Sequence, residues 1–251
     1  GIALTTLYAH TGWIGRWPWS REVHAKMTDL LVAGKARVIG NTVLLYEPQV
    51  SPGYQYITKL MEIVSQPVPE GAAASPETEK IAALLKEAES ALNTDRTLSE
   101  SYGKANTVLL PMTFRIGAAQ GRPDKALPAF VAKNRLEKVQ KQEGGGALEA
   151  YSVQFPIELL GGKASALGHL NYFRDVDGAI RAEPLVIQYY DEFYPSMALM
   201  IAAKHRNLEP KHIEVKLGEE VKLGNLRIPT DEFTLMNTFF YKGLEARPAF
   251  Q

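Results

Sequence analysis

Cysteine is absent from the 251-residue sequence, which excludes disulfide bonds, thiolate metal sites and a cysteine nucleophile. No run of about 18 apolar residues occurs, so no segment has the pattern of a bilayer-spanning helix. An excess of one charge is missing too, because 28 Lys and Arg residues balance 28 Asp and Glu residues. A chain without net charge lacks the basic surface typical of nucleic-acid-binding proteins, and we expect no nucleic-acid partner.

Motifs of the common enzyme classes are also missing. The sequence has no GxSxG nucleophile motif, no GxGxxG after a predicted strand and no GxxxxGK[ST] phosphate loop. The five histidines form no HExxH motif and no paired ligand spacing, so we predict neither a metal ion nor a cofactor. His10, which follows a predicted strand, is the one histidine that we would test for a functional role.

Hydrophobic periodicity predicts the elements of the N-terminal half. Apolar residues make up 45% of the chain, which is enough for a sizeable core. Near-continuous apolar runs predict buried strands at residues 2–9, 36–46 and 106–116. Helical spacing predicts helices at residues 20–33, 53–64 and 76–93. Pro111 inside the third strand predicts a bulge or an edge position.

Loop signals and short strands dominate the C-terminal half. Residues 117–150 are predicted to be a loop-rich insertion. Strands at 167–173 and 179–190 are predicted to form a hairpin, joined by a turn at Asp175, Asp177 and Gly178. The turn has the alternating acids of a calcium loop but lacks the downstream glutamate, so a turn without metal is favoured. A helix should follow Pro195 to about residue 206, and then strands at 212–217, 220–223, 225–229 and 233–241.

The order of these elements predicts the fold class. Strands alternate with helices first, and antiparallel hairpins come afterwards. We therefore predict a single α/β domain over residues 1–251. It should contain one mixed, partly parallel sheet flanked by helices, with antiparallel hairpins in the C-terminal half.

A ligand pocket is one interpretation of residues 16–21 (RWPWSR), which follow the first predicted strand. Open α/β sheets bind ligands beyond the carboxyl ends of their strands, where indoles and guanidiniums could line a pocket. The alternative, which buried aromatics usually favour, is that the tryptophans only cover the sheet edge. The candidate ligand-binding residues are His10, Trp13, Arg16, Trp17, Trp19, Asn41 and Glu47.

Several segments together resemble a known family. The segment RWPWSREVHAKMTDLLVAGKARVIG is similar to the opening of CHASE type 2 domains: a turn with two tryptophans, a helix, a glycine and a strand. LLYEP is similar to the end of that family's second strand. FPIEL, LGHLN, DVDGAIR and YPSMAL then follow the family pattern in order, as do Asn237 and Gly243. The resemblance covers nearly the whole chain and is weakest over residues 117–150.

The resemblance implies a non-catalytic, extracytoplasmic sensory domain of a bacterial membrane receptor. It implies a transmembrane helix before the domain, several after it, and a cytoplasmic nucleotide cyclase or protein kinase as the output. A chain that starts at Gly1 and stops at Gln251 is expected to be a segment of such a receptor. The family often has acidic residues near Tyr8 to His10 and Asn41, so we expect any acidic site there to be altered or lost.

Three hypotheses on function follow. The first is an input domain that binds an unknown small ligand and passes a shift in conformation to the output domain. The second is a structural module without a ligand, in which helix 76–93 pairs with its copy in a homodimer; packing of that helix on the sheet is favoured instead. The third is an α/β hydrolase or metal-dependent phosphotransferase, which would need converging acids or a nucleophile with its base.

Overall fold

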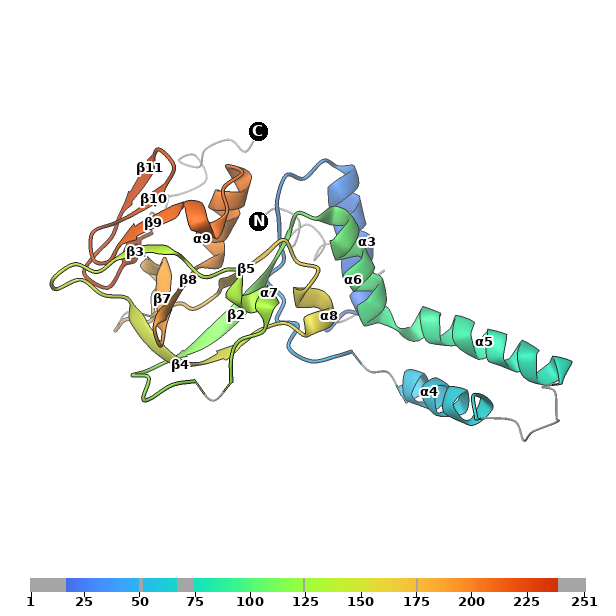
Figure 1. Ribbon diagram of the computed structural model, residues 1–251. Helices are drawn as coiled ribbons and strands as arrows, with labels where there is room; N and C mark the ends of the chain where they lie inside the picture. Colours follow the sequence, from blue (N-terminus) through green and yellow to red (C-terminus); the bar gives the residue numbers. More distant parts are fainter. Residues whose placement is uncertain (1–16, 50–51, 67–74, 124, 175, 239–251) are drawn as a thin grey trace. The chain divides into compact units, whose positions relative to one another are not determined.

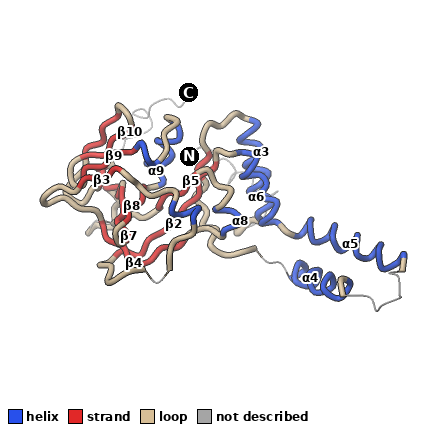
Figure 2. The backbone as a smooth tube through the Cα atoms, viewed as in Figure 1, coloured by secondary structure: helices blue, strands red, loops and turns tan. Residues whose placement is uncertain are grey.

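The computed structural model describes residues 17–49, 52–66, 75–123, 125–174 and 176–238. The chain divides into two compact units, residues 1–36 with 47–106 and residues 37–46 with 107–251. Figure 2 shows the strands in the second unit, whereas the described part of the first unit is helical. No helix among the described residues is both long and apolar enough to cross a bilayer. The predicted strand at residues 2–9 lies outside the described residues.

Two pairs of helices make up the described part of the first unit. α3 (Arg21–Ala33) packs against α6 (Thr94–Ala105), and α4 (Pro52–Val64) packs against α5 (Pro76–Leu92) (Figure 1). The helices predicted at 20–33, 53–64 and 76–93 are therefore confirmed, whereas α6 was not predicted. Within the first unit α5 pairs with α4, and the predicted packing of this helix on the sheet stays a prediction.

Capping side chains explain where α5 and α6 begin. The Ser75 hydroxyl accepts a hydrogen bond from the Thr78 backbone N–H at 3.3 Å, and Pro76 stands in the first turn of α5. The Asn93 side chain caps α6 in the same way, accepting from the Arg96 N–H at 3.1 Å. Each cap satisfies a backbone donor that has no partner within its own helix.

The second unit is built around a six-stranded sheet in the order β1-β2-β4-β7-β8, with β5 also paired to β2. Its strands are β1 (Ile39–Gly40), β2 (Val108–Ile116), β4 (Leu148–Gln154), β5 (Ala166–His169), β7 (Val186–Tyr189) and β8 (Glu192–Pro195). β1, β2 and β5 run parallel, as do β4 and β7, whereas β2–β4 and β7–β8 are antiparallel. This confirms the α/β class with a mixed, partly parallel sheet.

Antiparallel strands dominate the rest of the second unit, as predicted. A four-stranded sheet has the order β11-β10-β9-β3, and β12 pairs with β6. The strands are β3 (Lys138–Gln140), β6 (Ala182–Pro184), β9 (Ile213–Lys216), β10 (Glu220–Leu223), β11 (Leu226–Pro229) and β12 (Leu235–Asn237). Gly218 and Gly224 have φ of 78° and 61° at the turns between β9, β10 and β11. The described residues thus form three sheets where the sequence predicted one.

Short helices complete the second unit. They are α7 (Ala129–Ala132), α8 (Glu158–Gly161), α9 (Met197–His205) and the 3₁₀ helix η1 (Pro210–His212). α9, predicted after Pro195, packs against β5 and β2, and its apolar residues join the main buried cluster. The predicted loop-rich segment 117–150 contains α7, β3 and the start of β4. The predicted strand at 36–46 is reduced to the two residues of β1.

Pro111 lies in a strand with neighbours on both sides, so the predicted edge position is wrong. Leu109 accepts a hydrogen bond from the segment after β1, and Pro111, two residues on, faces that same side. Phe114 is bonded on the opposite side by the Asn171 side chain. On the side that Pro111 faces, the β1 pairing ends at Leu109 and the β4 pairing begins at Thr113. The missing N–H of Pro111 therefore falls between two partners and breaks no ladder bond.

The predicted hairpin after β5 is wrong, although its turn is real. β5 pairs with β2 and β6 pairs with β12, so the two strands are not partners. Gly178 has φ of 82°, and the Asp177 carboxylate accepts hydrogen bonds from the Ala179 N–H and the Arg181 guanidinium. Asp175 lies outside the described residues. Asp177 and Gly178 therefore determine the local turn, whereas long-range packing determines which strands pair.

Candidate functional site

The tryptophan turn, residues 17–19, precedes α3. It places the Trp19 indole inside the first unit and the Trp17 indole at the surface. The Trp17–Pro18 peptide bond is cis. Trp19 is buried, with 5% of its surface exposed, whereas Trp17 is 52% exposed. The two rings meet edge-on with centroids 5.6 Å apart, and the Trp17 ring also meets His24 edge-on at 5.8 Å. Trp19 is therefore packed inside the first unit, whereas Trp17 keeps an exposed ring surface at the start of the helix.

Arg21, in the first turn of α3, is the centre of a buried polar cluster. Its Nε lies 3.0 Å from Asp95 Oδ1 of α6, with side chains only 12% and 8% exposed. Its Nη2 donates to the Glu47 carbonyl oxygen at 3.0 Å. The second Asp95 oxygen accepts from the Gln49 N–H at 2.7 Å, and the Gln49 side chain accepts from the Arg21 N–H at 2.7 Å. The cluster thus ties the tryptophan turn to residues 47–49 and to α6.

His24 completes the aromatic group from within α3. Its ring is buried, and neither ring nitrogen has a hydrogen-bond partner in the described part of the chain. Burial lowers the pKa of His24, and the nearby Arg21 charge lowers it further. The structure places His24 in the buried part of the first unit.

The seven predicted ligand-binding residues are distributed as follows. His10, Trp13 and Arg16 lie outside the described residues. Trp17 and Trp19 lie together, and Glu47 contributes its backbone carbonyl to Arg21 beside them while its side chain is exposed. Asn41 belongs to the second unit, where it is buried and its side chain accepts from the Val43 N–H at 2.9 Å.

Arg21, Gln49 and Asp95 are polar residues of the site that were not predicted from the sequence. Arg21 stood in the RWPWSR segment, so its charge beside two indoles was a usable signal. Asp95 lies in the unpredicted helix α6, and its contact with Arg21 joins positions 74 residues apart. No local pattern identifies such a pair.

Asp95→Asn tests the polar cluster. An amide has one oxygen, so it must present its NH2 group to either Arg21 or the Gln49 N–H, both of which are donors. We expect the free energy of unfolding to fall by about 1.5–3 kcal/mol, as measured by urea titration. Glu22→Gln is the control because Glu22 pairs with Lys26 at the surface, and it should cost less than about 0.5 kcal/mol. Equal losses in both variants would contradict the structural role of the cluster.

In the second unit, the LGHLN and YPSMAL segments form a buried junction between β5 and α9. Gly168 lies directly against the backbone of Met197. His169 is fully buried, with its ring edge-on to Phe114 at 6.1 Å. The Ser196 hydroxyl caps α9 by accepting from the Leu199 N–H at 3.1 Å. These residues belong to the segments on which the family resemblance rested, and they pack β5 against α9 in the core.

A hollow of about 380 Å³ lies over β3, β9 and β10. Three lysines and three glutamates contribute to its lining. Lys138 of β3 pairs with Glu214 of β9 at 3.2 Å, and Lys222 pairs with Glu220 of its own strand, β10, at 2.9 Å. The hydrogen bond from Lys222 is the main cause that lowers the pKa of Glu220. Because these charges balance, the hollow selects neither an anion nor a cation.

Within the described ranges, no three His, Asp or Glu side chains gather in a way that could hold a metal ion. The converging acids that a metal-dependent phosphotransferase would need are therefore not found in this part of the chain.

Comparison with known families supports the resemblance. A family model described as CHASE2 domain matches residues 4–249, nearly the whole chain. Comparisons with curated proteins and with solved structures gave no match.

Proposed function

The chain belongs to the CHASE2 domain family, and from this membership we propose that it is the extracytoplasmic input domain of a bacterial membrane receptor. CHASE2 is a family of sensory domains of signalling receptors, and the match over residues 4–249 is the observation that carries the proposal. In this role the domain regulates a cytoplasmic output domain of the same parent chain, a nucleotide cyclase or a protein kinase. Transmembrane segments of that chain would transmit the signal.

The ligand site that we propose is the surface beside Trp17. An indole that is 52% exposed offers an aromatic face for stacking, and it rests on the buried Trp19 and His24 rings. The Arg21 cluster holds the start of α3 in place beneath it. A rigid aromatic surface loses little conformational entropy on binding, which favours a small planar or apolar ligand.

A thermal-shift screen of the whole chain against small metabolites and ions tests this site. A ligand present at about 100 times its Kd stabilises by about 2.7 kcal/mol, which should raise Tm by about 5–10 °C. The shift should disappear in Trp17→Ala. Phe233→Ala is the matched control because Phe233 is 50% exposed and belongs to the second unit.

Two outcomes would contradict the proposed site. A compound that shifts the wild type, Trp17→Ala and Phe233→Ala equally would bind away from Trp17. If Trp17→Ala in the full-length receptor left the regulation of its output unchanged, the Trp17 surface would have no sensory role.

A further inference from the structure

α5 exposes a line of large apolar side chains on one side. Ile81 is 49% exposed and Leu84 is 65% exposed, and no residue of the helix is buried. The face next to it, which includes the half-buried Leu85, lies against α4. α4 likewise leaves Tyr56, Leu60 and Ile63 between 46% and 68% exposed. Exposed apolar residues gathered in one hairpin are typical of an interaction surface.

Charged residues on α5 indicate what would cover this line. In a heptad register with Ile81 at a and Leu84 at d, Lys80 and Glu87 both fall at g positions. When two such helices lie antiparallel, an a residue of one packs beside a d residue of the other, and g positions face g positions. Ile81 of one copy then meets Leu84 of the other, while Lys80 meets Glu87. The two-fold symmetry forms each contact twice.

We propose that α5 pairs antiparallel with α5 of a second copy of this chain, through Ile81 and Leu84 flanked by two Lys80–Glu87 ion pairs. Neither Lys80 nor Glu87 has an ion-pair partner among the described residues of its own chain, so both are available to the second copy. The charges also select against a parallel pair, in which each g position faces an e position and e holds Thr78 and Leu85. This pairing goes beyond the sensory role and does not depend on a ligand.

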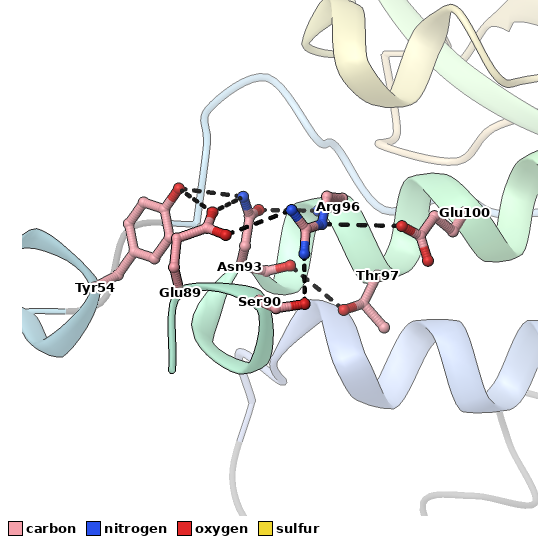
Figure 3. Close-up of polar contacts among 7 residues, drawn as sticks. All are labelled: Tyr54, Glu89, Ser90, Asn93, Arg96, Thr97 and Glu100. Carbon is pink, nitrogen blue, oxygen red and sulfur yellow. Dashed lines mark hydrogen bonds and ion pairs between the residues drawn. The ribbon is translucent and has the colours of Figure 1, made fainter. Parts of the chain in front are cut away.

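A polar cluster at the end of α5 keeps the exposed line in place (Figure 3). Tyr54 of α4 donates to Glu89 Oε1 at 3.1 Å, and the Asn93 amide donates to both Tyr54 and Glu89 at 3.1 and 3.0 Å. Arg96 of α6 reaches Glu89 Oε2 at 3.4 Å and Ser90 Oγ. The hydrogen bond from Asn93 is the main cause that lowers the pKa of Glu89. Because these contacts fix the side of α5 that faces α4, Ile81 and Leu84 stay exposed for pairing.

Cysteine cross-linking tests the pairing directly, because the chain has no cysteine of its own. An equimolar mixture of Ile81→Cys and Leu84→Cys chains should form a disulfide-linked heterodimer under mild oxidation. Glu79→Cys mixed with Lys86→Cys is the control, since these two exposed positions lie at the same level of the antiparallel pair but on the outer f positions. We expect at least about tenfold more cross-linked product from the first mixture. Equal yields from both mixtures would overturn the proposal.

Charge exchange tests the ion pairs in solution. Lys80→Glu places two glutamates opposite each other twice and should weaken the dimer about tenfold in sedimentation equilibrium. Adding Glu87→Lys to the same chain should restore the affinity to within about threefold of the wild type. Both positions are exposed, so the variants should fold. A wild-type chain that stays monomeric at millimolar concentration, or a double variant that stays weak, would overturn the pairing.

Discussion

Gly168→Ala should remove most of the stability of the chain. A Cβ atom at this position would lie 2.5 Å from Met197 Cα, 2.7 Å from Met197 N and 2.9 Å from the Ser196 carbonyl carbon. All three are backbone atoms, so no side-chain rotation can relieve the contact. β5 would have to separate from the start of α9, where His169 and Ser196 also pair. We expect a loss of at least about 3 kcal/mol, seen as a lowered urea midpoint or as insoluble protein.

Gly146→Ala is the matched control for this substitution. No atom lies within 4 Å of a Cβ built at Gly146, and its φ is not in the left-handed region. Alanine there should change the free energy of unfolding by less than about 0.5 kcal/mol, or even stabilise the chain slightly by restricting the unfolded state. If Gly168→Ala unfolds at the same urea concentration as Gly146→Ala, β5 and α9 do not approach as closely as described.

The helices could be predicted wherever capping and apolar spacing agree. α5 shows both, with Ser75 and Pro76 at its start and regular leucines along it. α6 was missed because the side that it buries includes polar residues, namely Asp95, Ser99 and Ser101 beside Leu98 and Tyr102. Hydrophobic periodicity identifies a helix by its apolar side. α6 is instead held against α3 partly by hydrogen bonds, for example from Ser101 to Asp29 at 2.6 Å.

The candidate site was predictable only in its local part. Trp17 and Trp19 stand two positions apart in the sequence, and their grouping in space followed from that spacing. The groups that hold the turn, Gln49 and Asp95, lie 28 and 74 residues from Arg21, and nothing near them in the sequence signals the contact. The predicted pairing of β5 with β6 was wrong for the same reason, because strand pairing depends on contacts across the whole sheet.

His169→Phe should make the free energy of unfolding depend less on pH at acidic pH. Burial lowers the pKa of His169 from its ordinary value of 6.5 to about 3. At a pH between these two pKa values, His169 is protonated in the unfolded chain and neutral in the folded chain. The free energy of unfolding therefore falls as the pH falls. One group fully inside this window contributes about 1.4 kcal/mol per pH unit. Phenylalanine removes that contribution, and its ring can keep the edge-on contact with Phe114.

The slope of the free energy of unfolding against pH reports on His169 more specifically than the free energy of unfolding at a single pH does. His24 has its pKa lowered by burial and then by the Arg21 charge, so it adds to the slope in the same direction in both proteins. The Glu183 carboxyl, whose pKa is raised by burial, binds its proton more readily in the folded chain and opposes the slope equally in both. Subtracting the two curves cancels these groups and leaves a difference of about 2–3 kcal/mol between pH 6 and pH 4.

Parallel curves for the wild type and His169→Phe would mean that the folded chain protonates His169 as readily as the unfolded one. A buried imidazolium would find no hydrogen-bond acceptor here among the described residues, because neither ring nitrogen has a partner there. Protonation could then occur only if β5 and α9 open to admit water. Because the same junction is closed by the backbone contact at Gly168, an opening of this kind in the wild type would also make Gly168→Ala mild. The two substitutions therefore test one feature, the tightness of the β5–α9 junction, by independent measurements.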